Sequence, residues 1–229
     1  IEVPGITINR YCASGLEAIA MAVSKIKAGI PQIYMAGGTE SMSLIPMTGY
    51  KLSPSYKANL ENLNYHVSMG ATAEAVAEKF NISRESADTF SLDSHKKAAN
   101  AIDQGYFEDE IVPITIQNRN EKLSFHSDEY IRHNINLSDI EKLHPAFKPD
   151  GTVTAGNASG INDGAALVLL MSIEEAEKRS LTPLAKIVSF ATAGVDPKYM
   201  GIGPVTASKK ALSKANWEIS DLDVIESNE

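Results

Sequence analysis

The sequence predicts an α/β fold that is interrupted by a long inserted segment. Residues 2–41 show the order strand, helix, strand, and a βαβ unit of this kind implies a parallel sheet. The same order returns in residues 185–226, after a stretch that begins with many Ser, Asn, Tyr and Pro residues. With 43% hydrophobic and 22% charged residues, the composition is that of a globular protein.

The first βαβ unit is predicted from three short patterns. Residues 2–9 (EVPGITIN) form an expected strand with an early Pro-Gly interruption. Apolar residues then recur at helical spacing from Leu16 to Ile26, and Gly29 ends the pattern. Residues 32–36 (QIYMA) are the second expected strand, which is followed by two glycines. Cys12 therefore falls at a predicted strand-to-helix turn.

The inserted segment, residues 42–151, contains two predicted helices and one strand. The helices are expected over residues 71–80 and 83–104, the second with Ser83 as its N-cap and Gly105 at its end. We expect its inward face to carry Ala87, Phe90, Ser94, Ala98, Ala101 and Ile102. Residues 111–116 are predicted to be an edge strand, because Pro113 cannot donate a ladder hydrogen bond.

The segment after the insertion returns to the sheet. Residues 152–164 are rich in Gly, Asn and Ser, a composition that lets another group approach the backbone closely. The continuous apolar run 165–171 is typical of a buried strand or of a turn of buried helix. A capping box at residues 172–175 starts a short helix. Residues 185–193, 205–215 and 222–226 are then predicted to be strand, helix and strand.

The charge and the cysteine content exclude several classes of function. There are 21 basic and 29 acidic side chains and the pI is near 5.2, so nucleic acid is not an expected partner. No apolar run reaches the roughly 18 residues that a membrane span requires. One cysteine rules out an internal disulfide framework and a multi-cysteine zinc site, and fits a reducing compartment, for which we expect the cytoplasm.

Cys12 is the first candidate for a chemical role. The unpaired N–H groups of a helix start favour a thiolate, which is the nucleophilic form of cysteine. The small neighbours Ala13, Ser14 and Gly15 favour access for a substrate. A small buried hydrophobic residue is the alternative, because free cysteine is among the most buried residue types. The pattern leaves both interpretations open.

No partner base for Cys12 can be identified from the pattern alone. A nucleophilic thiol usually needs a histidine as proton acceptor. The five histidines all fall in the inserted segment, where surface or structural roles are more frequent, and we expect His95 to be solvated: His66, His95, His126, His133 and His144. None has metal-ligand spacing with another, so no metal site is expected.

Five sequence blocks together resemble the thiolase family, whose members cleave 3-ketoacyl-CoA with coenzyme A or run the reverse Claisen condensation. The blocks are residues 8–16 (INRYCASGL), 36–43 (AGGTESMS), 69–74 (MGATAE), 151–164 and 200–204 (MGIGP). They occur in the order of the family along nearly the whole chain. The resemblance implies a layered α/β/α/β/α core with an inserted loop domain, incomplete in this chain.

The resemblance also implies domain limits. Residues 1–41 and 152–180 would belong to the N-terminal core domain, residues 42–151 would be the loop domain, and residues 181–229 would begin the C-terminal core domain. Family members are considerably longer, so we expect this chain to be a fragment that lacks an N-terminal part and most of the C-terminal domain.

Six positions match functional residues of the family. Cys12 would be the nucleophile that carries the acyl group, and Asn228 would hold a water near the thioester oxygen. Ser159 would contact the pantetheine arm, Arg132 would lie near the nucleotide end of coenzyme A, and Met69 and Phe147 would line the acyl and CoA channel. The resemblance implies acyl-CoA and coenzyme A as substrates, no cofactor, no metal, and a homodimer or homotetramer.

Two departures from the family pattern matter for function. The histidine of the family's G-H-P motif and its second cysteine have no counterpart here, so we expect the chain alone to be inactive. A noncatalytic acyl-CoA-binding or oligomerisation module is therefore an alternative, and a ketosynthase of the same superfamily is another. Ser68 stands where biosynthetic acetoacetyl-CoA thiolases often carry histidine, which favours a broader 3-ketoacyl-CoA thiolase over the short-chain enzyme.

Overall fold

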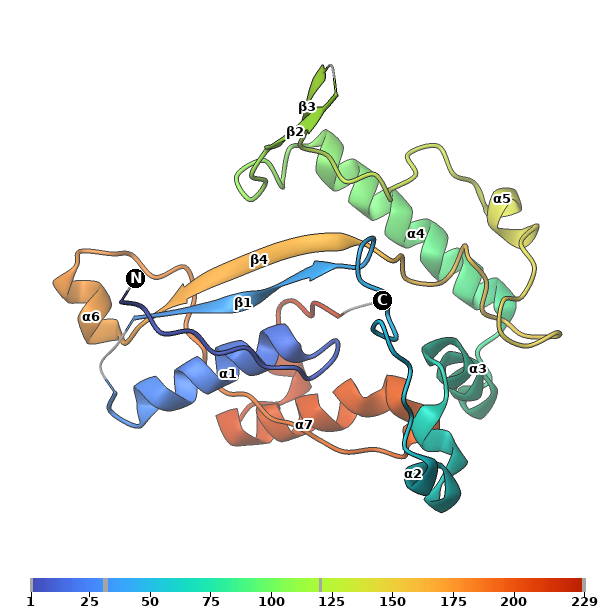
Figure 1. Cartoon of the computed structure of the whole chain (residues 1–229), viewed down its shortest axis with the longest axis horizontal. Coiled ribbons are helices and arrows are strands. Elements are labelled where there is room, and N and C mark those ends of the chain that lie inside the picture. The colour runs from blue at the N-terminus through green and yellow to red at the C-terminus, as the bar shows by residue number, and fades with distance from the viewer. Residues whose placement is uncertain (1, 31–32, 120, 228–229) are drawn as a thin grey trace. The chain divides into compact units, whose positions relative to one another are not determined.

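The computed structural model describes residues 2–30, 33–119 and 121–227 (Figure 1). The chain forms two compact units, which we describe separately. Unit 1 comprises residues 1–54, 161–194 and 203–226, and unit 2 comprises residues 55–160, 195–202 and 227–229. The domain limits given by the resemblance stay a prediction.

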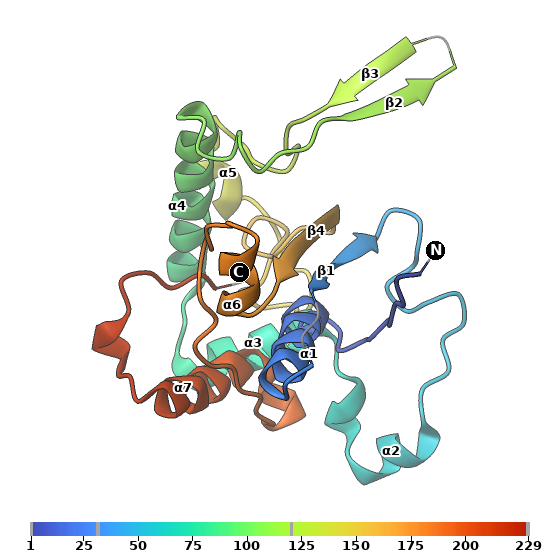
Figure 2. The ribbon, with the colours of Figure 1, turned by 90° about the vertical axis from the view of Figure 1, so that its left-hand side faces the viewer.

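Unit 1 is a two-stranded sheet with helices. Its elements are α1 (Ser14–Lys27), β1 (Tyr34–Ser41), β4 (Asp163–Leu170), α6 (Ile173–Lys178), α7 (Gly203–Ala215) and the 3-10 turn η3 (Ile219–Asp221). In Figures 1 and 2, α1 runs beside the strand pair. The predicted α/β fold class and the helix after Cys12 are confirmed.

The direction of the sheet differs from the prediction. β1 pairs with β4 in antiparallel register, from Tyr34 opposite Leu170 to Ser41 opposite Asp163. The prediction of a parallel sheet requires residues 2–9 as the strand partner of β1, but residues 2–9 form no strand. The strand partner of β1 is instead β4, which follows the inserted segment. The residue pattern within one βαβ unit carries no information about such a distant pairing.

In unit 1, α1 covers one face of β1. Ala20 and Val23 of α1 are buried, as is Ala36 of β1. Met35 and Leu169 face each other across the register on the opposite side and are 70% and 58% exposed. The predicted strand at residues 165–171 is thus found, but its predicted burial is wrong. The continuous apolar run signals a strand buried on both faces, whereas residues 163–169 of β4 are exposed on both faces in the described part of the chain.

The second predicted strand, helix, strand unit forms only its helix. α7 matches the prediction closely, whereas residues 185–193 and 222–226 are not strands. The preceding segment bonds to α7 and not to a ladder: Ser189 Oγ donates to the Ala211 carbonyl at 2.7 Å, and Lys214 Nζ donates to the Phe190 carbonyl at 3.0 Å. Hydrogen bonding to a helix thereby replaces the predicted strand pairing.

Unit 2 is mainly helical. Its elements are α2 (Tyr56–Glu61), the 3-10 turn η1 (Leu63–His66), α3 (Met69–Phe80), α4 (Arg84–Asp103), β2 (Ile114–Asn118), β3 (Glu121–Phe125), α5 (Leu137–Glu141) and the 3-10 segment η2 (Pro197–Ile202). The strand predicted at residues 111–116 starts later, just after Pro113, and pairs in a hairpin with β3, a strand that was not predicted (Figure 2).

α4 confirms the local signals and corrects the predicted face. The Ser83 side chain accepts a hydrogen bond from the Ser86 amide at 3.1 Å, and Gly105 has φ +73°, the left-handed conformation typical of a helix end. The buried residues are Asp88, Leu92 and Ala99, whereas Phe90, which was predicted to face inward, is 61% exposed. A buried carboxylate, which an apolar pattern cannot reveal, shifts the inward face.

No helix in the described ranges is long and apolar enough to cross a bilayer.

Candidate active site

Cys12 lies exposed in the turn that leads into α1. Tyr11, directly before it, has φ +48°, a left-handed conformation that costs a non-glycine residue about 1–2 kcal/mol. Such strain persists where surrounding hydrogen bonds hold it, and it concentrates at functional sites. The exposure argues against the alternative of a small buried hydrophobic residue.

Hydrogen bonds of the turn hold this conformation. The Tyr11 amide donates to Asn9 Oδ1 at 2.9 Å. Ser14 Oγ accepts from the Arg10 amide at 2.8 Å and donates to the Tyr11 carbonyl at 2.7 Å. Together these bonds fix the backbone on both sides of Cys12, so the thiol is presented on an ordered turn at the start of α1.

A second ordered segment is the Gly-rich loop, residues 151–160 of unit 2. The Asn157 side chain lies at its centre: Oδ1 accepts from the Thr154 amide at 2.7 Å, and Nδ2 donates to the Thr152 carbonyl and to Asp88 Oδ1, both at 2.8 Å. Asp88 is buried and pairs with Arg84 Nε at 2.6 Å. The hydrogen bond from Asn157 to the buried carboxylate of Asp88 therefore anchors the loop to α4.

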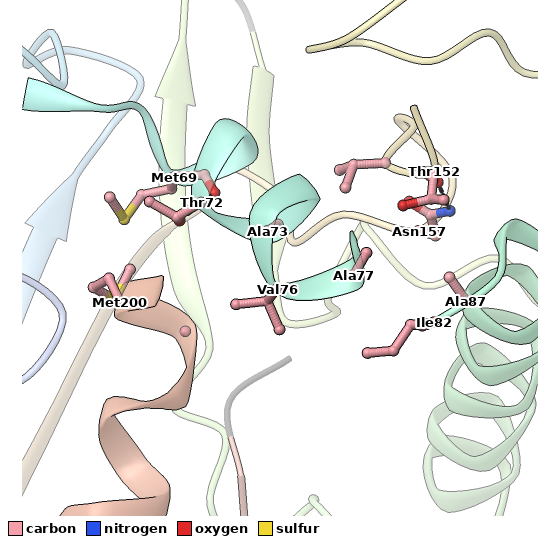
Figure 3. A pocket seen from close by; sticks show the side chains of 12 residues that line it. Met69, Thr72, Ala73, Val76, Ala77, Ile82, Ala87, Thr152, Asn157 and Met200 are labelled. Atoms are coloured by element: carbon pink, nitrogen blue, oxygen red, sulfur yellow. Dashed lines mark hydrogen bonds between the residues drawn. The ribbon is translucent and has the colours of Figure 1, made fainter. Parts of the chain in front are cut away.

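An apolar pocket of about 340 Å³ lies within unit 2 between α3, the Gly-rich loop and η2 (Figure 3). Met69, Thr72 and Val76 of α3 line it, with Asn157 from the loop. Met200 comes from η2, and its side chain lies beside that of Met69 in the close-up. The pocket has the apolar lining and the volume of a small-molecule site.

Unit 2 places the predicted binding residues at two positions. Met69 and Phe147 meet at the start of α3, because the Phe147 ring lies against Gly70 so closely that an added Cβ would come within 2.3 Å of it. Ser159 and Arg132 lie near Tyr130, whose hydroxyl donates to the Ala158 carbonyl at 3.0 Å.

Of the two predicted catalytic residues, Cys12 belongs to unit 1 and Asn228 lies outside the described residues.

The position of His95 corrects the expectation that it is solvated. Its ring is half-buried and lies 5.9 Å from the Tyr130 ring between centroids, and Nδ1 accepts from the Arg132 amide at 3.4 Å. Pattern alone placed His95 on a polar helix, and it could not show that the Tyr130–Arg132 segment folds back over α4. In the described part of the chain, no group of three potential metal ligands clusters.

Asp163 ties the two strands of unit 1 together where β4 begins. Its carboxylate accepts hydrogen bonds from the hydroxyl and the amide of Ser43, at 2.5 Å and 2.8 Å. These bonds, first that of the hydroxyl, hold the pKa of Asp163 below its ordinary value. The segment that follows β1 is thereby fixed to the end of the Gly-rich block.

The chain matches the family model for the thiolase N-terminal domain over residues 1–174 and that for the thiolase C-terminal domain over residues 181–229. The chain belongs to the thiolase family.

Curated relatives agree with this assignment. The acetyl-CoA acetyltransferase of Paracoccus denitrificans is 49% identical over 97% of this chain and 60% of its own length. The beta-ketothiolase BktB of Cupriavidus necator is 46% identical over 100% of this chain and 61% of its own length. The chain thus spans about 60% of the length of the thiolases that it matches.

Solved thiolase structures share the fold. Human mitochondrial 3-ketoacyl-CoA thiolase matches with a TM-score of 0.87 and 40% identity, over 97% of this chain and 60% of that one. The acetyl-CoA acetyltransferase of Bacillus anthracis matches with a TM-score of 0.83 and 44% identity, over 95% and 58%. The α/β fold of this chain is therefore that of an incomplete thiolase.

Sequence reasoning missed three residues of the candidate site. Met200 was part of a recognised block, 200–204, but no pattern placed it in a pocket beside Met69. Asn157 was a residue of the glycine-rich stretch, where its polar side chain between small residues was the available signal. Glu74 belongs to the block 69–74, and its burial was not detectable in a helix that carries other charged residues.

Proposed function

We propose that the protein to which this chain belongs is an acyl-CoA:acetyl-CoA acyltransferase, a thiolase that works through an S-acyl intermediate on Cys12. The observation that carries the proposal is the exposed Cys12 on an ordered turn at the start of α1, in a chain of the thiolase family. The names of relatives such as acetyl-CoA acetyltransferase and beta-ketothiolase support the same reaction class.

The reaction divides into two steps. The Cys12 thiolate attacks the keto carbon of 3-ketoacyl-CoA and forms a thioester as the bond between C2 and C3 breaks. The electron pair of that bond goes to C2, which takes up a proton, and acetyl-CoA leaves. Coenzyme A then gives up its thiol proton and attacks the thioester, which releases the shortened acyl-CoA and restores the thiolate. The reverse sequence is the Claisen condensation.

The experiment that tests this proposal traps the intermediate in the full-length protein. Incubation with labelled acetyl-CoA, followed by quenching and peptide mass spectrometry, should place the acyl label on Cys12. Cys12→Ser should abolish turnover and labelling while coenzyme A still binds, and the intact enzyme should show ping-pong kinetics. A label on another side chain, or full turnover by Cys12→Ser, would refute the proposal.

The binding roles follow the same proposal. Met69 and Phe147 would line the acyl and CoA channel, which the apolar pocket beside Met69 supports. Ser159 would contact the pantetheine arm and Arg132 the nucleotide end of coenzyme A. Asn228 would hold a water near the thioester oxygen. We propose no metal and no cofactor beyond coenzyme A and acyl-CoA as substrates.

We further propose a broad 3-ketoacyl-CoA thiolase, with the short-chain acetoacetyl-CoA enzyme as the alternative. Ser68 caps α3 by accepting from the Ala71 amide at 3.4 Å, directly before Met69. This is the position of the histidine of many short-chain enzymes. Assays that compare acetoacetyl-CoA with longer 3-ketoacyl-CoA substrates decide between them, since turnover restricted to acetoacetyl-CoA would refute the broad specificity.

A homo-oligomeric, cytoplasmic enzyme completes the proposal. The resemblance to thiolases supports a homodimer or homotetramer, and the single cysteine suits a reducing compartment. Light scattering of the full-length protein tests the assembly, and a monomer would contradict it. Fractionation of the source cells tests the location.

A further inference from the structure

We propose that Glu74 is a positioning residue that holds the Gly-rich loop, residues 151–160, at a fixed place against α3 and so sets the affinity for the CoA thioester arm. This inference rests on the proposed thiolase function. It assigns to Glu74 a part in substrate binding that acts through the loop that carries Ser159.

The Glu74 carboxylate is buried and is fully engaged by the loop. The side chain is only 7% exposed. Oε2 accepts from the Thr152 amide at 3.0 Å and from the Thr152 hydroxyl at 3.2 Å, and Oε1 accepts from the Val153 amide at 2.8 Å. No cation among the described residues pairs with Glu74. Hydrogen bonds to an ionised acceptor are stronger than neutral ones, so successive amides of the loop are firmly held.

The contact between helix and loop is as close as glycine allows. A Cβ added to Gly151 would lie 2.2 Å from Glu74 Oε1. A side chain at residue 151 would therefore push the loop away from α3. The carboxylate and the glycine form one close contact.

The same helix carries the pocket wall. Met69 and Thr72 of α3 line the apolar pocket, and Thr152 and Val153 of the loop line it from the other side. The bonds of Glu74 thus join two walls of one pocket. Further along the loop, Asn157 is fixed to Asp88 of α4, so the segment that leads to Ser159 is held at two points.

The loop end that carries Ser159 has its own support. Tyr130 donates its hydroxyl to the Ala158 carbonyl at 3.0 Å, and its ring leaves no room for a side chain at Gly160, where a Cβ would lie 2.6 Å away. With this end fixed, a shift at Thr152 and Val153 changes the spacing between Met69 and the loop. Glu74 is the side chain that sets this spacing.

The test uses the full-length enzyme with two variants and a matched control. Glu74→Gln keeps the shape but turns an amide group toward backbone donors, whereas Thr152→Val removes only the hydroxyl bond. The control is Glu78→Gln, one turn further along α3, where the carboxylate is exposed and pairs with Lys148 at 3.7 Å. Steady-state kinetics, calorimetric binding of free coenzyme A and thermal unfolding are measured for each protein.

We expect Glu74→Gln to raise KM and the dissociation constant for coenzyme A about tenfold, with kcat within about twofold, because uniform binding is lost. Thr152→Val should raise both constants about threefold, and Glu78→Gln should change neither.

A lower melting temperature with unchanged KM and unchanged coenzyme A affinity in both variants would show a purely structural role and overturn the inference. A fall in kcat alone would also overturn it. If Glu74→Gln fails to fold, Thr152→Val decides by the same criteria. Absence of thiolase turnover in the wild-type protein would refute the proposed function. The role of Glu74 would then be tested separately, by calorimetric binding of coenzyme A to the wild-type protein and the variants.

Discussion

Asn157→Ala tests how strongly the Gly-rich loop is anchored. The substitution removes the bonds of the side chain with the Thr154 amide, the Thr152 carbonyl and the Asp88 carboxylate, all in a partly buried setting. Two neutral bonds contribute about 1 kcal/mol each, and the bond to a charged acceptor contributes about 1.5–3 kcal/mol. The free energy of unfolding should therefore fall by about 3.5–5 kcal/mol.

Urea unfolding of the full-length protein measures this change, and hydrogen–deuterium exchange locates it. We expect faster exchange confined to residues 151–160 and the facing part of α4. Asn100→Ala is the control, because Asn100 is exposed on α4, the helix that carries Asp88. Its effect on the free energy of unfolding should stay within about 0.5 kcal/mol. A loss below about 1 kcal/mol for Asn157→Ala, with unchanged exchange in the loop, would refute the reasoning.

Three further predictions concern other parts of the chain. Ile140→Ala should cost about 2–5 kcal/mol of unfolding free energy, because Ile140 is 0% exposed, whereas Leu184→Ala at a fully exposed site should cost less than about 0.5 kcal/mol in the same denaturation assay. Ser14→Ala should cost about 1 kcal/mol by loosening the turn before α1, measured by thermal unfolding. Ser43→Ala should raise the pKa of Asp163 toward its ordinary value in an NMR titration, and an unchanged pKa would contradict the assigned cause.

The sign of the Asp163 effect follows from linkage. The hydrogen bonds of Ser43 favour the ionised carboxylate in the folded protein, so the pKa of Asp163 is lower there than in the unfolded chain. The resulting stabilisation is present above the ordinary carboxyl pKa and disappears as the pH falls through the lowered value. Ser43→Ala removes the hydroxyl bond, the larger cause, and keeps the backbone amide bond, so it should reduce this part of the acid sensitivity.

Local structure was predictable where the signal lies within a few residues. The N-cap Ser83, the terminal Gly105 and the span of α7 all appear as the sequence indicated. Capping and backbone conformation are short-range properties, so pattern captures them. The burial of Asp88 was not predictable, because it depends on Asn157 arriving from a distant loop.

The pairing of β1 was the main feature of the fold that the sequence predicted wrongly. The expected partner of β1 was the nearest strand in the sequence, whereas the register joins it to β4, which follows the insertion. Pairing between segments so far apart depends on packing that alternation of residues does not encode. The same limit explains why residues 185–193 pair with α7 through side chains and not with a strand.

For the candidate site, the sequence indicated which residues have a chemical role but not which contacts hold them in place. The apolar periodicity after Cys12 predicted that it lies at a helix start, and the small residues beside it favoured access, which agrees with its exposure. Its catalytic role stays a prediction. The strained backbone of Tyr11 and the anchoring of the Gly-rich loop by Glu74 had no local signature. Such supports arise from contacts between segments that are distant in the sequence, so no local pattern indicates them.

Because α3 supports three separate contacts, the effects of substitutions at different positions of this helix are expected to depend on one another. Met69 lines the pocket, Gly70 leaves room for the Phe147 ring, and Glu74 holds the loop. Residues that share one rigid helix and neighbouring partners are expected to give nonadditive effects in double-mutant cycles. Directed evolution of substrate choice in this protein would therefore succeed more readily with libraries that vary these positions jointly than with one position at a time.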